Sequence, residues 1–288
     1  MTHEPDIVSR ISTMFGQLRG AEQKIARVVL DDMTFAAHAN ISELAERAGV
    51  SEATITRFAR AVDCTNVRDL KLRLAQSLAV GQRFYTEAKV EPSSTHGVYE
   101  AVKTALEHNA ALMTEKVIRG AIELLSPAKQ VLIFGVGGGS TVMAQEFQYR
   151  LFRLGFSAAA YSDPMLMRMA SASVDSSDVV ICLSVGGYSP DVQDAMEIAQ
   201  EYGARALGIT TKDSPLGRGV DQLVPIETME TDFIFKPSAS RYVMLAAIDV
   251  LATELATRHK RKSRETLRRI KHTLDNHKQG QDRLPLGD

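Results

Sequence analysis

Gln130-Val-Leu-Ile-Phe-Gly-Val-Gly-Gly-Gly-Ser-Thr141 is the stretch that decides the fold of this chain. Its apolar run is typical of a strand buried on both faces of a parallel sheet, and apolar residues at helical spacing follow the glycines. A glycine-rich turn at a helix start directs free N–H groups and the positive end of the helix dipole toward one point. Ser140 adds a hydroxyl at or near the N-cap. We therefore expect a phosphate-bearing small ligand here.

Strands and helices alternate beyond this stretch, which predicts a parallel sheet with helices on both faces. The further strands are expected at residues 156–161, 178–183, 205–210 and 222–226, and a long apolar helix at 238–257. The apolar surface of that helix exceeds what one stripe needs, which indicates burial against a second subunit as well as its own sheet.

A second loop, Ser184-Val-Gly-Gly-Tyr-Ser189, also joins a buried strand to a helix start. Because ligands of open α/β sheets bind beyond the carboxyl ends of the strands, the two loops are expected to converge on one ligand. Ser162 and Asp163 lie at the same edge and suit sugar hydroxyls. Serine and glycine are also ordinary turn residues, and one such loop alone would predict little. The expected ligand-binding residues are Gly137, Gly139, Ser140, Thr141, Ser162, Asp163, Ser184, Gly186, Gly187 and Ser189.

Residues 41–60 fit a helix-turn-helix. Leu44, Ala45 and Ala48 would face inward, Gly49 supplies a turn residue that tolerates positive φ, and Ser51 would cap the second helix. The alternative is a helical hairpin with a solvated charged face, but the second helix exposes short polar groups and two arginines suited to base edges and phosphates. Residues 1–80 carry about as many acids as bases, so Lys71 and Arg73 would supply extra phosphate contacts. The expected DNA-binding residues are Ser51, Glu52, Ala53, Thr56, Arg57 and Arg60.

The composition is that of a globular protein with room for two domains: net charge −1, 44% hydrophobic and 24% charged residues. We expect an all-α helix-turn-helix domain at 1–80, a linker at 81–97, an α/β domain at 98–279 and a disordered tail at 280–288. No membrane span or signal-peptide core is visible, and Cys64 and Cys182 are expected to be buried thiols, which predicts a cytoplasmic protein. The histidines lack ligand spacing, so no metal or other cofactor is expected.

The chain resembles the RpiR family of bacterial transcription regulators, in which a helix-turn-helix domain precedes a sugar isomerase (SIS) domain. Three segments carry the resemblance: Gly49-Val-Ser-Glu-Ala-Thr-Ile-Thr-Arg-Phe58, Phe134-Gly-Val-Gly-Gly-Gly-Ser140 and Leu183-Ser-Val-Gly-Gly-Tyr-Ser189. Within the family it is similar to HexR-type regulators of central carbon metabolism, in part through Leu72-Arg-Leu-Ala-Gln-Ser-Leu-Ala79 and Asp249-Val-Leu-Ala-Thr253.

The resemblance implies a regulator that binds double-stranded operator DNA and senses a phosphorylated sugar or sugar acid, with 2-keto-3-deoxy-6-phosphogluconate as a candidate effector. It implies that Ser140 and Ser184 contact the phosphate. The chain departs from the family pattern Ser-x-Ser-Gly-x-Thr, because Gly186 replaces the second hydroxyl residue and Ser189 replaces threonine. We expect a homodimer or homotetramer, and the sequence leaves repressor and activator roles open.

Two alternatives keep the fold but change the function. A sugar-phosphate isomerase needs a positioned base, whereas Tyr188 occupies the loop position that carries glutamate in some SIS isomerases, so no catalytic residue is expected. A dinucleotide sensor would use the glycine-rich turn and Asp163, but Ser140 replaces the third glycine of that fingerprint. The basic segment 258–271 is expected to be a solvated helix, with extra contact to DNA phosphates as the alternative.

Overall fold

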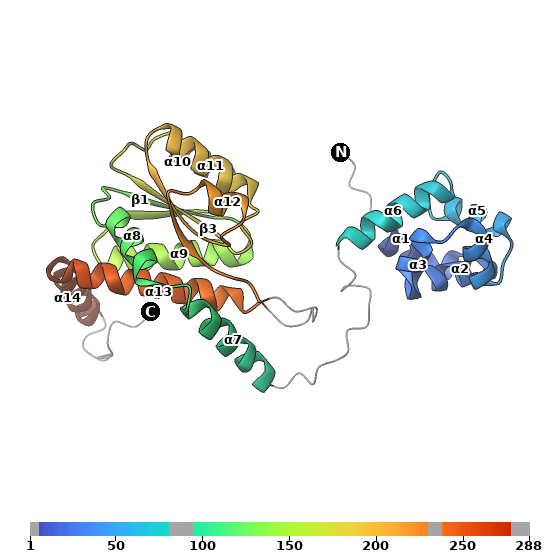
Figure 1. Ribbon diagram of the computed structural model, residues 1–288, viewed down its shortest axis with the longest axis horizontal. Helices are drawn as coiled ribbons and strands as arrows, with labels where there is room; N and C mark the ends of the chain where they lie inside the picture. The colour runs from blue at the N-terminus through green and yellow to red at the C-terminus, as the bar shows by residue number, and fades with distance from the viewer. Residues whose placement is uncertain (1–5, 81–94, 230–237, 278–288) are drawn as a thin grey trace. The chain divides into compact units, whose positions relative to one another are not determined.

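The computed structural model describes residues 6–80, 95–229 and 238–277 (Figure 1). They form two compact units, which we treat separately: residues 6–80, and residues 95–229 with 238–277. Most of the expected linker and the whole expected tail, 280–288, lie outside the described residues. Residues 95–97 of that linker form the first turn of a helix.

The first unit is helical throughout its described length. Its core consists of large apolar side chains from every α-helix, among them Ile11, Ile25, Ile55, Phe58 and Leu70, each fully buried. A single 3₁₀ turn, Phe15–Gln17, joins the first two helices. The α-helices are α1 Ile7–Met14, α2 Gly20–Asp31, α3 Met33–His38, α4 Ile41–Ala48, α5 Glu52–Ala61 and α6 Val67–Val80.

The second unit is built on a five-stranded sheet in which every neighbouring pair is parallel, as expected. The strand order is β2-β1-β3-β4-β5. The strands are β1 Val131–Gly135, β2 Ala158–Tyr161, β3 Val179–Ser184, β4 Arg205–Thr210 and β5 Gln222–Pro225.

Helices cover both faces of this sheet, and α9 and α13 lie on the face opposite α10 and α11 (Figure 1). Alternate residues of β1 serve the two cores: Val131 and Ile133 pack with α8, α9 and α13, and Leu132 and Phe134 with α10, α11 and α12. The helices are α7 Thr95–Ala110, α8 Glu115–Leu125, α9 Gly138–Arg153, α10 Pro164–Ser171, α11 Pro190–Glu201, α12 Pro215–Gly219, α13 Ser240–Arg258 and α14 Lys260–His277. The fold class is therefore confirmed, while α12 is an element that the sequence pattern did not predict.

The strand order decides where a ligand can bind. The chain leaves β1 toward β2 on one side, and β3 pairs with β1 on the other side, with Gly135 opposite Leu183. The crevice of an open α/β sheet lies where the strand order reverses in this way. The loops that follow β1 and β3 are therefore neighbours at the carboxyl edge of the sheet.

Candidate functional site

The first loop turns directly into α9. Gly137 is the N-cap, with φ +87°, and the helix begins at Gly138, so Ser140 is its third residue and lies near the cap, within what the sequence suggested. A Cβ atom at Gly135 would lie 2.4 Å from the carbonyl oxygen of Ser140, so this glycine permits the close strand–helix approach. Next to Gly137 and Gly139, by contrast, a Cβ would meet no atom within 4 Å. The loop thus has open space beside its backbone.

In this loop one side chain stabilises the turn, and the backbone at the helix start has free hydrogen-bond donors. The Thr141 hydroxyl donates to the carbonyl of Gly135 at 3.2 Å, which braces the turn. Ser140 is buried, with 9% of its surface exposed. Because α9 starts here, its first N–H groups have no partners within the helix and remain available to an anion.

The second loop, after β3, is stabilised by a hydrogen bond between two of its own residues. The buried Ser184 hydroxyl accepts a hydrogen bond from the Gly187 N–H at 3.1 Å, and Gly187 has φ +72°. Ser189 is the N-cap of α11 but makes no capping hydrogen bond with its side chain. A Cβ at Gly186 would meet no atom within 4 Å, and Tyr188 is 78% exposed. The loop therefore presents backbone and hydroxyl groups to open space.

A third loop, residues 211–214 after β4, packs against the second loop and was not predicted. The Thr211 hydroxyl donates to the carbonyl of Val185 at 2.9 Å, and the Leu216 N–H donates to that of Gly187 at 3.3 Å. The Thr210 hydroxyl is fully buried and has no hydrogen-bond partner among the described residues. The sequence signal for this loop is the pair of hydroxyl residues, Thr211 and Ser214, between the fourth strand and Pro215.

The remaining predicted ligand residues follow β2. The Asp163 carboxylate accepts from the Leu166 N–H at 2.7 Å and caps α10, so one of its functions is structural. Further along α10, Arg168 donates to both Asp191 and Asp194 of α11. These two carboxylates raise the pKa of the Arg168 guanidinium. The last turn of α10 is therefore tied to the start of α11.

The helix-turn-helix of the first unit has the predicted geometry. Leu44, Ala45 and Ala48 of α4 are buried, and Gly49 adopts φ +62° in the turn. Ser51 is the N-cap of α5, as expected, but its hydroxyl pairs with Thr54 Oγ1 at 2.9 Å rather than with a backbone N–H.

The predicted DNA-facing residues lie on one side of α5. Thr56 is half-buried, and Ser51, Glu52, Ala53, Arg57 and Arg60 are exposed. Glu52 accepts a hydrogen bond from the Ser42 hydroxyl, which leaves this side chain committed to α4.

The two auxiliary cations on α6 are less available than the sequence suggested. Arg73 is ion-paired with Asp69 at 3.1 Å, and Lys71 donates to the carbonyl of His38 at 3.4 Å. An arginine already held by a carboxylate gains less from a phosphate, because the existing pair must first be broken. The guanidinium groups of α5 are therefore the stronger candidates for contact with DNA.

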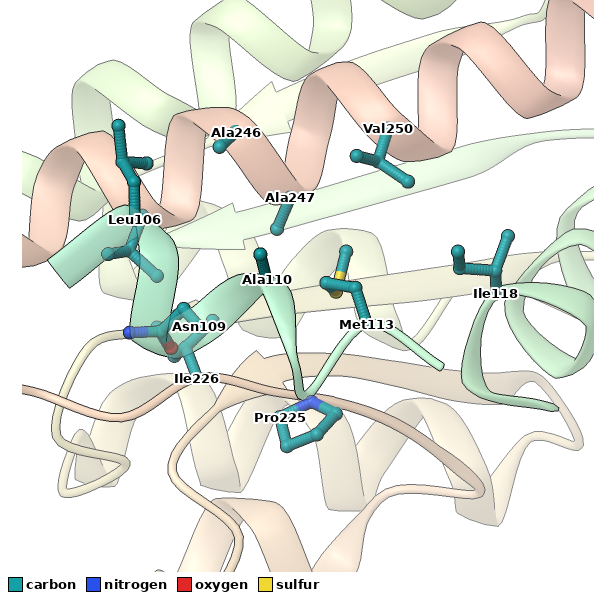
Figure 2. A pocket seen from close by; sticks show the side chains of 11 residues that line it. Leu106, Asn109, Ala110, Met113, Ile118, Pro225, Ile226, Ala246, Ala247 and Val250 are labelled. Atoms are coloured by element: carbon teal, nitrogen blue, oxygen red, sulfur yellow. The ribbon is translucent and has the colours of Figure 1, made fainter. Parts of the chain in front are cut away.

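An apolar pocket of about 370 Å³ lies in the second unit (Figure 2). The amide of Asn109 is its main polar feature, and both ends of that amide are already bonded to the backbone of Glu227. The pocket therefore offers little to an anion and is distinct from the two serine loops. Its lining residues are Leu106, Asn109, Ala110, Met113, Ile118, Pro225, Ile226, Val243, Ala246, Ala247 and Val250.

Cys64 and Cys182 are free and buried, as expected, and burial raises the pKa of the Cys64 thiol to about 11. Within residues 6–80, 95–229 and 238–277, no helix is long and apolar enough to cross a bilayer, and no group of three or more His, Cys, Asp or Glu side chains could hold a metal ion. On α14, Glu265 binds both Arg268 and Arg269.

Comparison with known proteins places the chain in a family. Residues 6–81 match the model of the helix-turn-helix domain of the rpiR family, and residues 124–254 match that of the SIS domain. The chain is 33% identical to the HTH-type transcriptional regulator HexR of Pseudomonas aeruginosa over 93% of this chain and 95% of that protein. It is 30% identical to HexR of Escherichia coli K12 over 98% of this chain and 99% of that protein.

A solved structure supports the same fold. The Vibrio vulnificus NanR protein, complexed with ManNAc-6P, aligns with a TM-score of 0.59 and 19% identity over 93% of this chain and 97% of that chain. With a helix-turn-helix in the first unit, two serine loops at the crevice of the second, and matches to both domain models, the chain belongs to the RpiR family of transcriptional regulators that carry a SIS domain, and it is similar to the HexR regulators.

Proposed function

We propose that this regulator binds operator DNA through α5 and senses a phosphorylated sugar or sugar acid at the loops that carry Ser140 and Ser184. The observation that carries the proposal is the adjacency of the two loops at the strand-order reversal, with open space beside Gly137, Gly139 and Gly186. Hydroxyls and free N–H groups at a helix start suit phosphate oxygens. The 6-phosphosugar in the NanR structure supports the ligand class.

The candidate effector is 2-keto-3-deoxy-6-phosphogluconate, which carries both a phosphate and a carboxylate. Its hydroxyl groups suit Ser162 and Asp163, because the Asp163 carboxylate keeps one oxygen for a hydroxyl after capping α10. Gly186 lacks the hydroxyl of the family pattern. In this loop the hydroxyl contacts to the ligand therefore fall to Ser184 and Ser189.

Regulation follows if the two units are coupled in a homodimer or homotetramer. Recognition helices of a dimer read half-sites about 34–36 Å apart, so a ligand that favours one quaternary arrangement changes operator affinity. The coupling is reciprocal: operator DNA changes effector affinity by the same factor.

Catalysis has less support than sensing. Two acids near the loops are engaged, because Asp191 binds Arg168 and Glu146 binds Arg150. An isomerase needs a base that is free to take a proton from the sugar carbon. The dinucleotide alternative assigns Asp163 to a ribose, whereas this carboxylate caps α10.

The proposal is tested by measuring operator binding at fixed salt against a panel of phosphorylated sugars and sugar acids. We expect one member to change operator affinity, and Ser140→Ala and Ser184→Ala to abolish that response while leaving DNA affinity without effector unchanged. Ser176→Ala is the matched control, since Ser176 is exposed and precedes β3 at the opposite edge of the sheet. A response that survives in both serine variants would refute the site, and turnover of a phosphosugar would favour the isomerase.

DNA contact has its own test. Each phosphate contact contributes about 0.9 to the slope of log affinity against log salt. We expect Arg57→Ala and Arg60→Ala each to lower that slope by about this amount if they contact phosphates, or to weaken binding only to the cognate operator if they contact bases. Variants that bind operator and random DNA as the parent does would exclude α5 as the recognition helix.

A further inference from the structure

The charges at the carboxyl edge of the sheet are distributed unevenly. In the described loops that follow the five strands, the acidic residues are Asp163, Asp213 and Glu227, and Lys212 is the single cation. Lys212 is exposed, and no ion pair joins it to a residue that the structure describes. Among the described parts of the strand-end loops, a phosphorylated ligand at this edge would therefore meet one positive side chain.

Cations on the neighbouring helices are already engaged. Arg168 is held by two carboxylates of α11. Arg218 of α12 donates to the carbonyl of Asp213 at 2.6 Å, which braces the third loop. Arg241 of α13 lies over the ring of Tyr242 at 4.9 Å. Lys212 is thus the cation in this region with the fewest prior commitments.

The loop that carries Lys212 is fixed against the predicted phosphate loop. Besides the hydrogen bonds from Thr211 and Leu216, a Cβ at Gly187 would lie 1.9 Å from the Ser214 Oγ atom. The two hydrogen bonds resist separation of the loops, and the close packing leaves no room for them to rearrange against one another. The Lys212 backbone is therefore held at a defined position beside the second serine loop.

The position of this loop relative to the two serine loops indicates which part of a bound ligand it would contact. The serine loops follow β1 and β3, and β4 lies one strand further from β1, about 4.8 Å beyond β3. On the opposite flank, Asp163 lies in the loop that follows β2 and caps α10. A ligand whose unphosphorylated end is negatively charged is repelled by Asp163 on the β2 flank and can form an ion pair with Lys212 on the β4 flank.

Resting on the proposed function, we infer that Lys212 pairs with a second anionic group of the effector, and so selects phosphorylated sugar acids over phosphorylated neutral sugars. The neighbouring Asp213 is exposed and opposes this attraction, so the selectivity depends on direct contact with the ammonium group rather than on the net charge of the loop. A ligand without the second anion lacks this ion pair, and that difference in contacts is what separates the two ligand classes.

The test compares 6-phosphogluconate, which has a phosphate and a carboxylate, with glucose 6-phosphate, which has only the phosphate, by calorimetry on the full chain. We expect the parent protein to prefer 6-phosphogluconate, and Lys212→Ala to weaken that ligand about tenfold, or about 1.4 kcal/mol, while glucose 6-phosphate changes less than about twofold. Lys212→Arg retains the preference, and Asp213→Asn strengthens it.

The control variant is Lys129→Ala, because Lys129 is exposed and precedes β1 at the opposite edge, so it removes the same charge far from the loops. Equal affinities in the parent and Lys212→Ala, an equal loss for both ligands, or a parent preference for glucose 6-phosphate would each overturn the inference while the sensing function stands. A parent that binds neither ligand nor any other phosphosugar would overturn both. Thermal unfolding of each variant confirms that the fold is intact.

Discussion

Replacing Gly187 directly tests how the loops after β3 and β4 pack against each other. Its φ of +72° costs an L-residue about 1–2 kcal/mol. A Cβ at this position would lie 1.9 Å from the Ser214 Oγ atom and 2.8 Å from the Thr210 Oγ1 atom, and overpacking of this kind costs about 1–3 kcal/mol. The lower entropy of the unfolded chain offsets about 0.5 kcal/mol. We therefore expect Gly187→Ala to destabilise the second unit by about 2–4 kcal/mol.

The measurement is chemical or thermal unfolding followed by circular dichroism. A loss of this size lowers the melting temperature of a unit this large by roughly 5–15 °C. Gly186→Ala is the matched control, because a Cβ at Gly186 meets no atom within 4 Å and its φ is not positive, so we expect a change within about 0.5 kcal/mol.

A double variant separates the two sources of strain. Adding Ser214→Gly to Gly187→Ala removes the clash with Ser214 but keeps the unfavourable φ and the close contact with Thr210, so its destabilisation should be smaller than the sum of the single effects. Equal stability of Gly187→Ala and Gly186→Ala would refute the packing of the third loop on the second.

Three further results are expected from the same reasoning. Ser184→Ala should lower the free energy of unfolding by about 1–3 kcal/mol, because it leaves the buried Gly187 N–H without its hydrogen-bond acceptor. Ser140→Ala should be nearly neutral. A larger loss for Ser140→Ala than for Ser184→Ala would contradict the hydrogen bond. Gly49→Ala should destabilise the first unit by about 1 kcal/mol in thermal unfolding, from its positive φ alone, and no loss would contradict the turn. Cys64 and Cys182 should resist alkylation at pH 8 until the chain unfolds, because burial raises the pKa of both thiols; mass spectrometry that finds rapid labelling of native protein would contradict their burial.

Local patterns accounted for the helix-turn-helix because its determinants are close together in the chain. Gly49 supplies the positive φ, and the inward positions of α4 and α5 follow from helical periodicity. The same holds for the alternation of strands and helices, from which the parallel sheet could be predicted. Local rules left the exact start of α9 open, because Ser140 is a favoured cap residue, whereas Gly137 is the cap and Ser140 is the third residue of the helix.

The sequence by itself determined the two domain types, the positions of the strands, and the two serine loops at strand ends, since each depends on residue spacing within about twenty positions. Only the tertiary structure decided that β3 lies beside β1, that Ser184 turns its hydroxyl to Gly187, and that a third loop with Lys212 packs beside them. The physical reason is that strand order and loop contacts depend on side chains distant in sequence, whose packing no local periodicity records.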